Sequence, residues 1–103
     1  MNIRGLAGIA SFGAALAIAS SGVAAYTGTE FEKDAKISIE KASAIALKAR
    51  PGKITGRELE REKGGSGLRY SFDVESRGVT YEVGIDAVTG KVLENDLEGK
   101  SPD

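Results

Sequence analysis

The sequence predicts an α+β domain in which one N-terminal helix packs on one face of a four-stranded antiparallel β-meander, preceded by a signal peptide. Three observations lead to this prediction: a charge-free stretch near the N-terminus, a segment with apolar residues at helical spacing, and alternating apolar and polar residues from Lys53 onward. A chain of 103 residues allows one domain. The predicted boundaries are 1–25 for the signal peptide, 26–36 for a linker, 37–97 for the folded domain and 98–103 for a disordered tail.

The N-terminal segment has the three-part layout of a secretory signal peptide. Arg4 is followed by uncharged, Ala-, Ile- and Leu-rich sequence, and small residues at Val23 and Ala25 occupy the positions that a signal peptidase reads. We expect cleavage after Ala25, a periplasmic or extracellular location, and no stable membrane insertion of the cleaved protein. The alternative is an uncleaved anchor, but several Gly and Ser residues make this a weak membrane span. No Cys follows the small residues, which excludes a lipoprotein.

The helix is predicted from Ser38 to Arg50. The hydroxyl of Ser38 can cap its N-terminus, and Pro51 followed by Gly52 ends it. The upstream linker, residues 26–36, holds at most one helical turn. The predicted buried stripe of the helix consists of Ile39, Ala42, Ile45, Ala46 and Ala49.

Residues 68–76 and 79–86 alternate strictly and are predicted to pair as antiparallel strands through Arg77-Gly78. This register sets Tyr70 against Ile85 and places every facing apolar pair on the same side. Arg is nevertheless a poor residue for the positive φ of a two-residue turn. The remaining predicted pairs are Phe72 with Val83 and Val74 with Tyr81.

The strand over residues 53–62 is the weakest prediction of the four. A bulge is expected near Gly56, because Ile54 and Leu59 have opposite parity, and the many charges are typical of a sheet edge. Residues 64–67, Gly-Gly-Ser-Gly, are predicted to be a flexible connection to the next strand.

The last hairpin is predicted to turn through a three-residue loop, residues 88–90, with Gly90 at positive φ. In this register Leu93 and Leu97 are buried opposite Ile85 and Tyr81. A slip of one residue would instead bury the two carboxylates of Glu94 and Asp96. The structural turn residues are Asp86, Thr89 and Gly90.

The outer face of the predicted sheet is acidic. Asp73 and Glu82 face each other across a hairpin, where they could hold Ca²⁺ or tune a proton, or could simply form a solvated repulsive pair. The face as a whole is either an ordinary solvated surface or a docking surface for a basic partner. Its members are Glu58, Glu60, Glu62, Arg69, Asp73, Glu75 and Glu82.

Composition excludes several function classes. The chain has no His and no Cys, so thiol chemistry, an imidazole base and the usual zinc sites are ruled out. No nucleophile and base are seen together, so we expect no enzyme, no catalytic residue, no metal and no cofactor. Without Arg4 the chain has 13 basic and 15 acidic residues, which argues against nucleic acid as a partner.

The run from Tyr81 to Leu93, Tyr-Glu-Val-Gly-Ile-Asp-Ala-Val-Thr-Gly-Lys-Val-Leu, resembles the signature of the PepSY domain. The order of three pieces carries the resemblance over residues 37–97: Ile37-Ser-Ile-Glu-Lys-Ala42, the Ala-rich helix that ends in Pro51-Gly-Lys-Ile54, and this closing run. The resemblance implies an exported or outward-facing module with one helix on an antiparallel sheet. It also implies a role beside peptidases, as in thermolysin-like propeptides, or a small free-standing exported protein. We expect the second kind, because no peptidase sequence follows.

Two functional hypotheses result. The first is an exported, non-enzymatic PepSY protein that binds and modulates another extracytoplasmic protein, with a peptidase as the partner that the resemblance suggests. The second is a module that binds a cation or small ligand through the acidic face around Asp73 and Glu82. A weak homodimer is left open.

Overall fold

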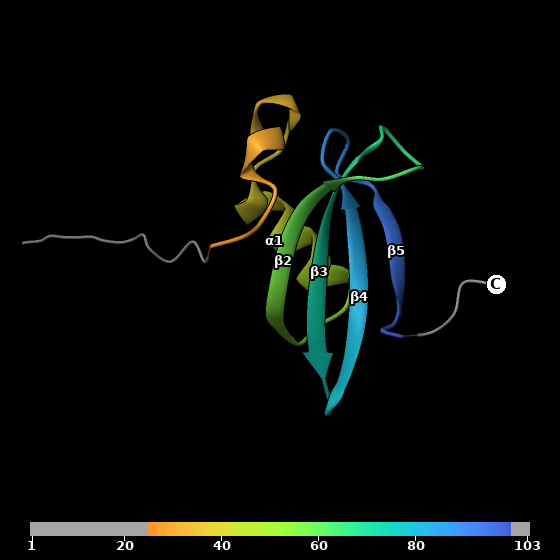
Figure 1. Ribbon diagram of the computed structural model, residues 1–103. Coiled ribbons are helices and arrows are strands. Elements are labelled where there is room, and N and C mark those ends of the chain that lie inside the picture. Colours follow the sequence, from red (N-terminus) through yellow and green to blue (C-terminus); the bar gives the residue numbers. More distant parts are fainter. Residues whose placement is uncertain (1–24, 100–103) are drawn as a thin grey trace, which may run out of the picture.

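A computed structural model describes residues 25–99, which form one helix layer on a four-stranded sheet (Figure 1). The strands run antiparallel in the order β2-β3-β4-β5, and α1 covers one face, so the predicted α+β architecture is confirmed. The predicted signal peptide and residues 100–103 of the predicted tail lie outside the described residues. The elements are the 3₁₀ helix η2 (Thr29–Asp34), α1 (Ile39–Ala49), β2 (Lys53–Arg61), β3 (Leu68–Ser76), β4 (Val79–Asp86) and β5 (Val92–Leu97).

The helix α1 begins where the sequence predicts. Ser38 is its N-cap, and the Ser38 hydroxyl accepts a hydrogen bond of 3.1 Å from the Lys41 N–H. Ala42 and Ala46 are completely buried against the sheet. Because both side chains are small, α1 can lie close to the strands below it.

The core fills the space between α1 and the sheet. Tyr70 and Phe72 stack with ring centroids 6.4 Å apart, and the Tyr70 hydroxyl donates a hydrogen bond of 2.8 Å to the Ile37 carbonyl. The phenol therefore has a partner although its ring is buried. The buried apolar residues are Ile39, Ala42, Ala46, Leu59, Leu68, Tyr70, Phe72, Val74, Val83, Ile85 and Ala87.

The pairing of β3 with β4 follows the predicted register, with Tyr70 opposite Ile85. The turn between them places both Arg77 (φ 56°) and Gly78 (φ 77°) in the left-handed region. Such a turn matches the twist of the flanking strands, and this match outweighs the poor preference of Arg for positive φ. The other two predicted pairs, Phe72 with Val83 and Val74 with Tyr81, are also formed.

The edge strand β2 carries the predicted bulge, between Ile54 and Gly56. Its outer edge is occupied by the chain just before η2: Thr27 pairs with Glu58 in a parallel bridge, and the Leu59 N–H donates to the Thr27 carbonyl at 2.8 Å. Gly28 passes so close that a Cβ there would lie 1.8 Å from the Leu59 carbonyl oxygen.

Residues 26–36 were expected to be a linker, but in the structure they pack on the domain. The Tyr26 ring contacts Tyr70 edge-on at 6.3 Å, and Phe31 packs against the core. Two aromatic rings can be buried here because β2 is an edge strand and leaves part of the core uncovered. In Figure 1 this segment lies on the same side of the molecule as β2.

The strand β5 departs from the predicted register at its start. Leu97 lies opposite Tyr81 as predicted, but Val92 rather than Leu93 lies opposite Ile85. An irregularity between Gly84 and Ile85 takes up the extra residue. The predicted burial of both leucines is also wrong, because Leu93 is half-buried and Leu97 is 46% exposed.

The connection over residues 64–67 was predicted to be flexible, but it forms a defined loop. The Gly67 N–H donates to the Gly64 carbonyl at 3.0 Å, and the Glu62 N–H donates to the Gly67 carbonyl at 3.1 Å. Gly64, Gly65 and Gly67 all have positive φ. The glycines are therefore needed for the loop conformation and do not merely loosen it.

Candidate functional site

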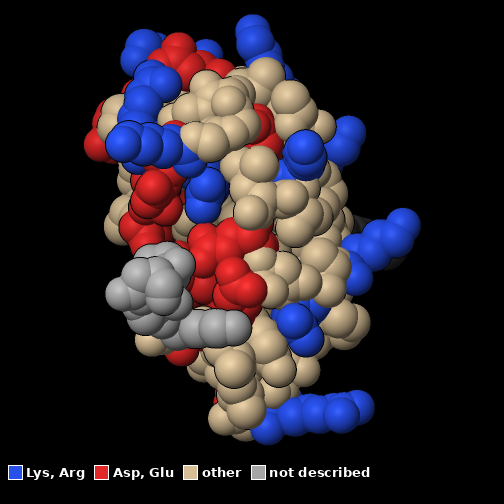
Figure 2. All heavy atoms as spheres, turned by 90° about the vertical axis from the view of Figure 1, so that its right-hand side faces the viewer, with Lys and Arg blue, Asp and Glu red and all other residues tan. Residues whose placement is uncertain are grey.

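The outer face of the sheet, on the side away from α1, is the first candidate site. Glu58, Glu60, Arg69, Asp73 and Glu82 alternate with core residues and gather on this face. The last two predicted members lie at its margins, because Glu75 is near the β3–β4 turn and Glu62 follows the end of β2. Figure 2, which views the molecule from the side of β5, shows acidic side chains gathered across the middle and basic ones mostly toward the rim.

A row of three carboxylates crosses this face. Asp73 lies opposite Glu82, and Glu82 lies opposite Asp96 on the next strand. We call Asp73, Glu82 and Asp96 the carboxylate row. None of them forms an ion pair with a basic residue of the described chain. Like charges directly opposite each other destabilise a sheet, so the row has an energetic cost that the described residues do not offset.

Arg69 is the basic residue at the centre of the outer face, but it is already engaged. Its guanidinium lies 3.2 Å from the Glu94 carboxylate and donates to the Lys63 carbonyl at 3.2 Å. The side chain crosses Gly84, where a Cβ would lie 3.1 Å from the Arg69 Cδ. Its buried Nε has no partner in the described chain. Arg69 thus neutralises Glu94 and leaves the carboxylate row uncompensated.

Burial and neighbouring charges raise the pKa of two glutamates on the outer face, Glu82 and Glu58. Burial raises the pKa of Glu82, and the charges of Glu94 and Asp73 raise it further. The pKa of Glu58 is raised by burial and by Glu60. These carboxylates therefore bind a proton more readily than isolated ones.

A hollow of about 320 Å³ opens on the β2 side of the same face. Asp73 and Glu82 lie at one side of it and Thr27 at another. Arg57 also lines it, although its Cα pairs with that of Phe72, a residue of the core. The lining also includes Gly56, Glu58 and Ser71.

Sequence reasoning missed Glu94 and Asp96 as members of the outer face. The structure places Glu94 opposite Gly84 and Asp96 opposite Glu82, so both belong to the same surface as the predicted residues. The signal was present in the alternation of the last strand, but the prediction used these two residues only to choose the register.

The turn residues Asp86, Thr89 and Gly90 form a structural centre at one end of the sheet. Asp86 is 1% exposed, and its carboxylate accepts hydrogen bonds from Val88 N–H (2.8 Å), Thr89 N–H (3.0 Å), Ser66 N–H (2.6 Å) and the Ser66 hydroxyl (2.8 Å). Burial raises the pKa of Asp86, but these donors outweigh it and hold the pKa at about 2. Gly90 has the predicted positive φ of 81°.

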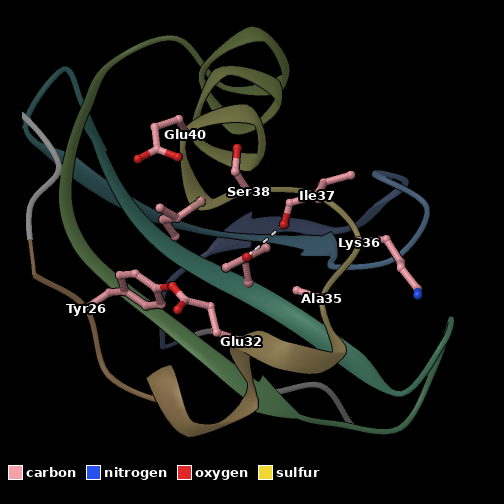
Figure 3. Close-up of a pocket in the computed structure, with 9 residues that line it drawn as sticks. Tyr26, Glu32, Ala35, Lys36, Ile37, Ser38 and Glu40 are labelled. Carbon is pink, nitrogen blue, oxygen red and sulfur yellow. Dashed lines mark hydrogen bonds between the residues drawn. The ribbon is translucent and has the colours of Figure 1, made fainter.

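A second hollow, of about 340 Å³, lies between η2 and the start of α1 (Figure 3). Tyr26 and Glu32 point toward each other across it, and the Tyr26 hydroxyl donates to the Glu32 carboxylate. Burial raises the pKa of Tyr26 and Tyr70, and both hydroxyls are engaged in hydrogen bonds. Neither phenol is therefore poised as a base. Sequence reasoning missed this hollow because Tyr26 was placed in a linker.

The outer face offers charged groups that can bind a surface of opposite charge. Among residues 25–99, no three His, Cys, Asp or Glu side chains lie close enough together to hold a metal ion. The same residues include no helix that is long and apolar enough to cross a membrane. What the outer face does provide is a concentration of negative charge on a rigid, hydrogen-bonded sheet.

Comparisons with known proteins give one match. The family model PepSY, described as Peptidase propeptide and YPEB domain, matches residues 36–96. Comparisons with curated proteins and with solved structures found no match. The matched range begins just before α1 and ends in β5, so it covers the helix and all four strands.

Proposed function

Because the chain belongs to the PepSY family, whose members are associated with peptidase propeptides and regulatory modules, we propose that it is an exported, non-enzymatic protein that binds and modulates another extracytoplasmic protein. A peptidase is the partner that the family association favours. PepSY domains are usually extracellular or periplasmic, which supports the same compartment for this chain.

The observation that carries the proposal is the carboxylate row. Asp73, Glu82 and Asp96 stand directly opposite one another on adjacent strands, and no basic residue of the described chain pairs with them. A basic surface on a partner would remove the mutual repulsion of the row as it binds. Relief of this repulsion would mainly make association with the partner faster and more selective for a basic surface.

The experiment begins with the tagged full chain expressed in its own cells, cross-linked, and purified from the envelope fraction. The peptidase activity of any captured partner is then measured with and without the purified protein. We expect a partner whose activity changes when the protein is added. Capture of no partner, together with no effect on exported peptidases, would contradict the proposal.

A matched pair of variants tests the role of the outer face. Asp73→Asn/Glu82→Gln removes two charges from the carboxylate row and should weaken partner binding about tenfold or more, with a smaller dependence on salt. Glu30→Gln/Glu40→Gln removes two exposed charges from η2 and α1 and should leave binding unchanged. Equal effects of the two variants would show that only net charge matters.

The alternative of a module for a cation or small ligand is not adopted, because no observation favours it. The described carboxylates form a row across a sheet and do not converge on one point. Ca²⁺ needs six to eight oxygen ligands around a centre. Calorimetry with Ca²⁺ would revive the alternative if it showed binding that Asp73→Asn/Glu82→Gln abolishes.

A further inference from the structure

We propose that the partner binds through an extended segment in which basic and apolar residues alternate, and that this segment adds a fifth strand to the sheet along the free edge of β5. This inference rests on the proposed function, since it specifies which part of a protein partner binds and how. The inference depends on the backbone and side chains of β5, which are more accessible to an added strand than those of β2 at the opposite edge.

The two edges of the sheet are not equally available. At β2 the Leu59 N–H already donates to the Thr27 carbonyl, and η2 packs beside the strand. Within residues 25–99, no segment pairs with the outward side of β5. Figure 1 shows β5 along one side of the sheet, opposite the side where β2 and the N-terminal segment lie. Within residues 25–99, β5 is therefore the edge whose outward side is left unpaired along its whole length, and it is the better suited of the two to accept a new strand.

The outward backbone groups of β5 can be identified from its ladder. The Glu98 N–H donates to the Thr80 carbonyl at 2.9 Å. Along two antiparallel strands, residue pairs that exchange backbone hydrogen bonds alternate with pairs that do not. Because Glu98 is hydrogen-bonded to β4, the backbone of Asp96 is hydrogen-bonded to β4 as well. The N–H and carbonyl groups of Asn95 and Leu97 therefore point away from β4. These groups offer main-chain hydrogen bonds to an added strand, which is how extended peptides bind at sheet edges.

The side chains of β5 indicate which residues the added strand should carry. On the face toward α1, Leu97 is 46% and Val92 is 40% exposed, so apolar residues of an added strand would bury surface there. On the outer face, Asp96 ends the carboxylate row and has no basic partner in the described chain. A Lys or Arg opposite Asp96 would lie within reach of it. Because β5 is apolar on one face and acidic on the other, the added segment should alternate apolar and basic residues.

A second copy of this chain is a poorer occupant of the edge. Two β5 strands paired with each other would set the outer-face carboxylates of one copy against those of the other. Like charges facing each other across strands repel, and the carboxylate row would then extend further. Charged edge residues also discourage indiscriminate strand pairing, which makes the edge selective for a basic segment.

The first test uses a fluorescent peptide, Lys-Val-Arg-Val-Lys-Val-Arg-Val, and measures its binding to the purified protein by fluorescence anisotropy. A peptide with the same composition in two blocks, Lys-Arg-Lys-Arg followed by four Val, is the control for charge alone. The alternating peptide should bind about tenfold more tightly, because only this peptide places its basic residues on the outer face and its Val residues on the face toward α1. Equal binding of the two peptides would overturn the proposal.

The second test alters the edge itself. Leu97→Pro removes an outward N–H without removing a ladder bond, since Pro is tolerated where the N–H faces solvent. It should weaken binding of the alternating peptide about tenfold, whereas Leu97→Ile, which keeps both the N–H and an apolar side chain, should change binding less than about threefold. Asp96→Asn should weaken binding and reduce its dependence on salt, and Glu62→Gln, at the opposite edge, should not.

A peptide carrying N-methyl groups on alternate residues tests the same point without any change to the protein, should Leu97→Pro be poorly folded. Methylation of the N–H groups that face β5 should abolish binding, and methylation of the intervening ones should not. If both methylated peptides bind like the parent, no strand is added and the proposal is wrong.

Three further outcomes separate this inference from the proposed function. If a captured partner binds Leu97→Pro normally but is lost with Asp73→Asn/Glu82→Gln, the edge inference fails and the proposed function stands. If no partner is captured and no exported peptidase is affected while the alternating peptide binds as described, the proposed function fails and the edge inference stands. If the protein sediments as a dimer that Leu97→Pro converts to a monomer, the occupant is a second copy and the inference is overturned.

Discussion

The two ends of β4 are joined to the neighbouring strands by turns that each contain a glycine at positive φ but differ in what surrounds that glycine. At the β3–β4 turn, Gly78 has a φ of 77° and a Cβ there would meet no atom within 4 Å. At the β4–β5 turn, Gly90 has a φ of 81°, and a Cβ would lie 3.3 Å from the Ile45 Cδ1. One turn is exposed, while the other packs under α1 and is held by Asp86. A glycine at a similar positive φ is therefore expected to matter more for stability at the β4–β5 turn than at the β3–β4 turn.

The largest effect is expected from Asp86→Ala. The substitution removes the buried carboxylate that accepts from the N–H groups of Ser66, Val88 and Thr89, and it releases the 64–67 loop from the turn. We expect a loss of about 3–5 kcal/mol in the free energy of unfolding, measured by urea denaturation. Asp96→Ala is the control at an exposed position, and equal losses would show that the Asp86 network stabilises nothing.

Gly90→Val should have the next largest effect. It forces a β-branched residue into the left-handed region and pushes it against Ile45, at a cost of about 2–4 kcal/mol. The matched control is Gly78→Val, which has the same strain in φ but open space around it, and should cost about 1–2 kcal/mol less. Thermal melts that show the two variants to be equal would rule out a contribution from packing under α1.

The pH dependence of stability tests the same turn without restructuring it. The pKa of Asp86 in the folded protein is about 2, below its ordinary value of 3.8. The lowered pKa stabilises the fold at pH values above about 4, and this contribution of about 2 kcal/mol is lost as the pH falls toward 2. Asp86→Asn should remove this part of the acid sensitivity. An unchanged profile in Asp86→Asn would assign the sensitivity to other carboxylates.

The smallest effect is expected at the exposed turn. Arg77 has a φ of 56°, which Asn adopts more readily, so Arg77→Asn should stabilise the protein by about 0.5–1 kcal/mol. Arg77→Val should destabilise it by a similar or larger amount. If chemical denaturation shows neither change, the positive φ of Arg77 does not affect the free energy of unfolding.

Much of the fold and part of the candidate site could be predicted from the sequence. The alternation through Tyr70 and Phe72 fixed the face that each strand buries, and Ser38 marked the start of α1. The same alternation placed Asp73 and Glu82 on the outer face. The start of β5 could not be predicted, because Val92 and Leu93 are both apolar and either could lie opposite Ile85.

The sequence by itself determined the secondary structure, the order of the strands and the acidic character of the outer face, because these depend on residue spacing within one or two neighbouring elements. Only the tertiary structure decided that Asp86 is buried, since its partner Ser66 lies 20 residues away. The tertiary structure also decided that Tyr26 packs on Tyr70 and that Thr27 pairs with the β2 edge, while the β5 edge stays open within the described chain. Such contacts depend on which surfaces remain uncovered after the sheet and helix have packed, and no local pattern in the chain encodes that.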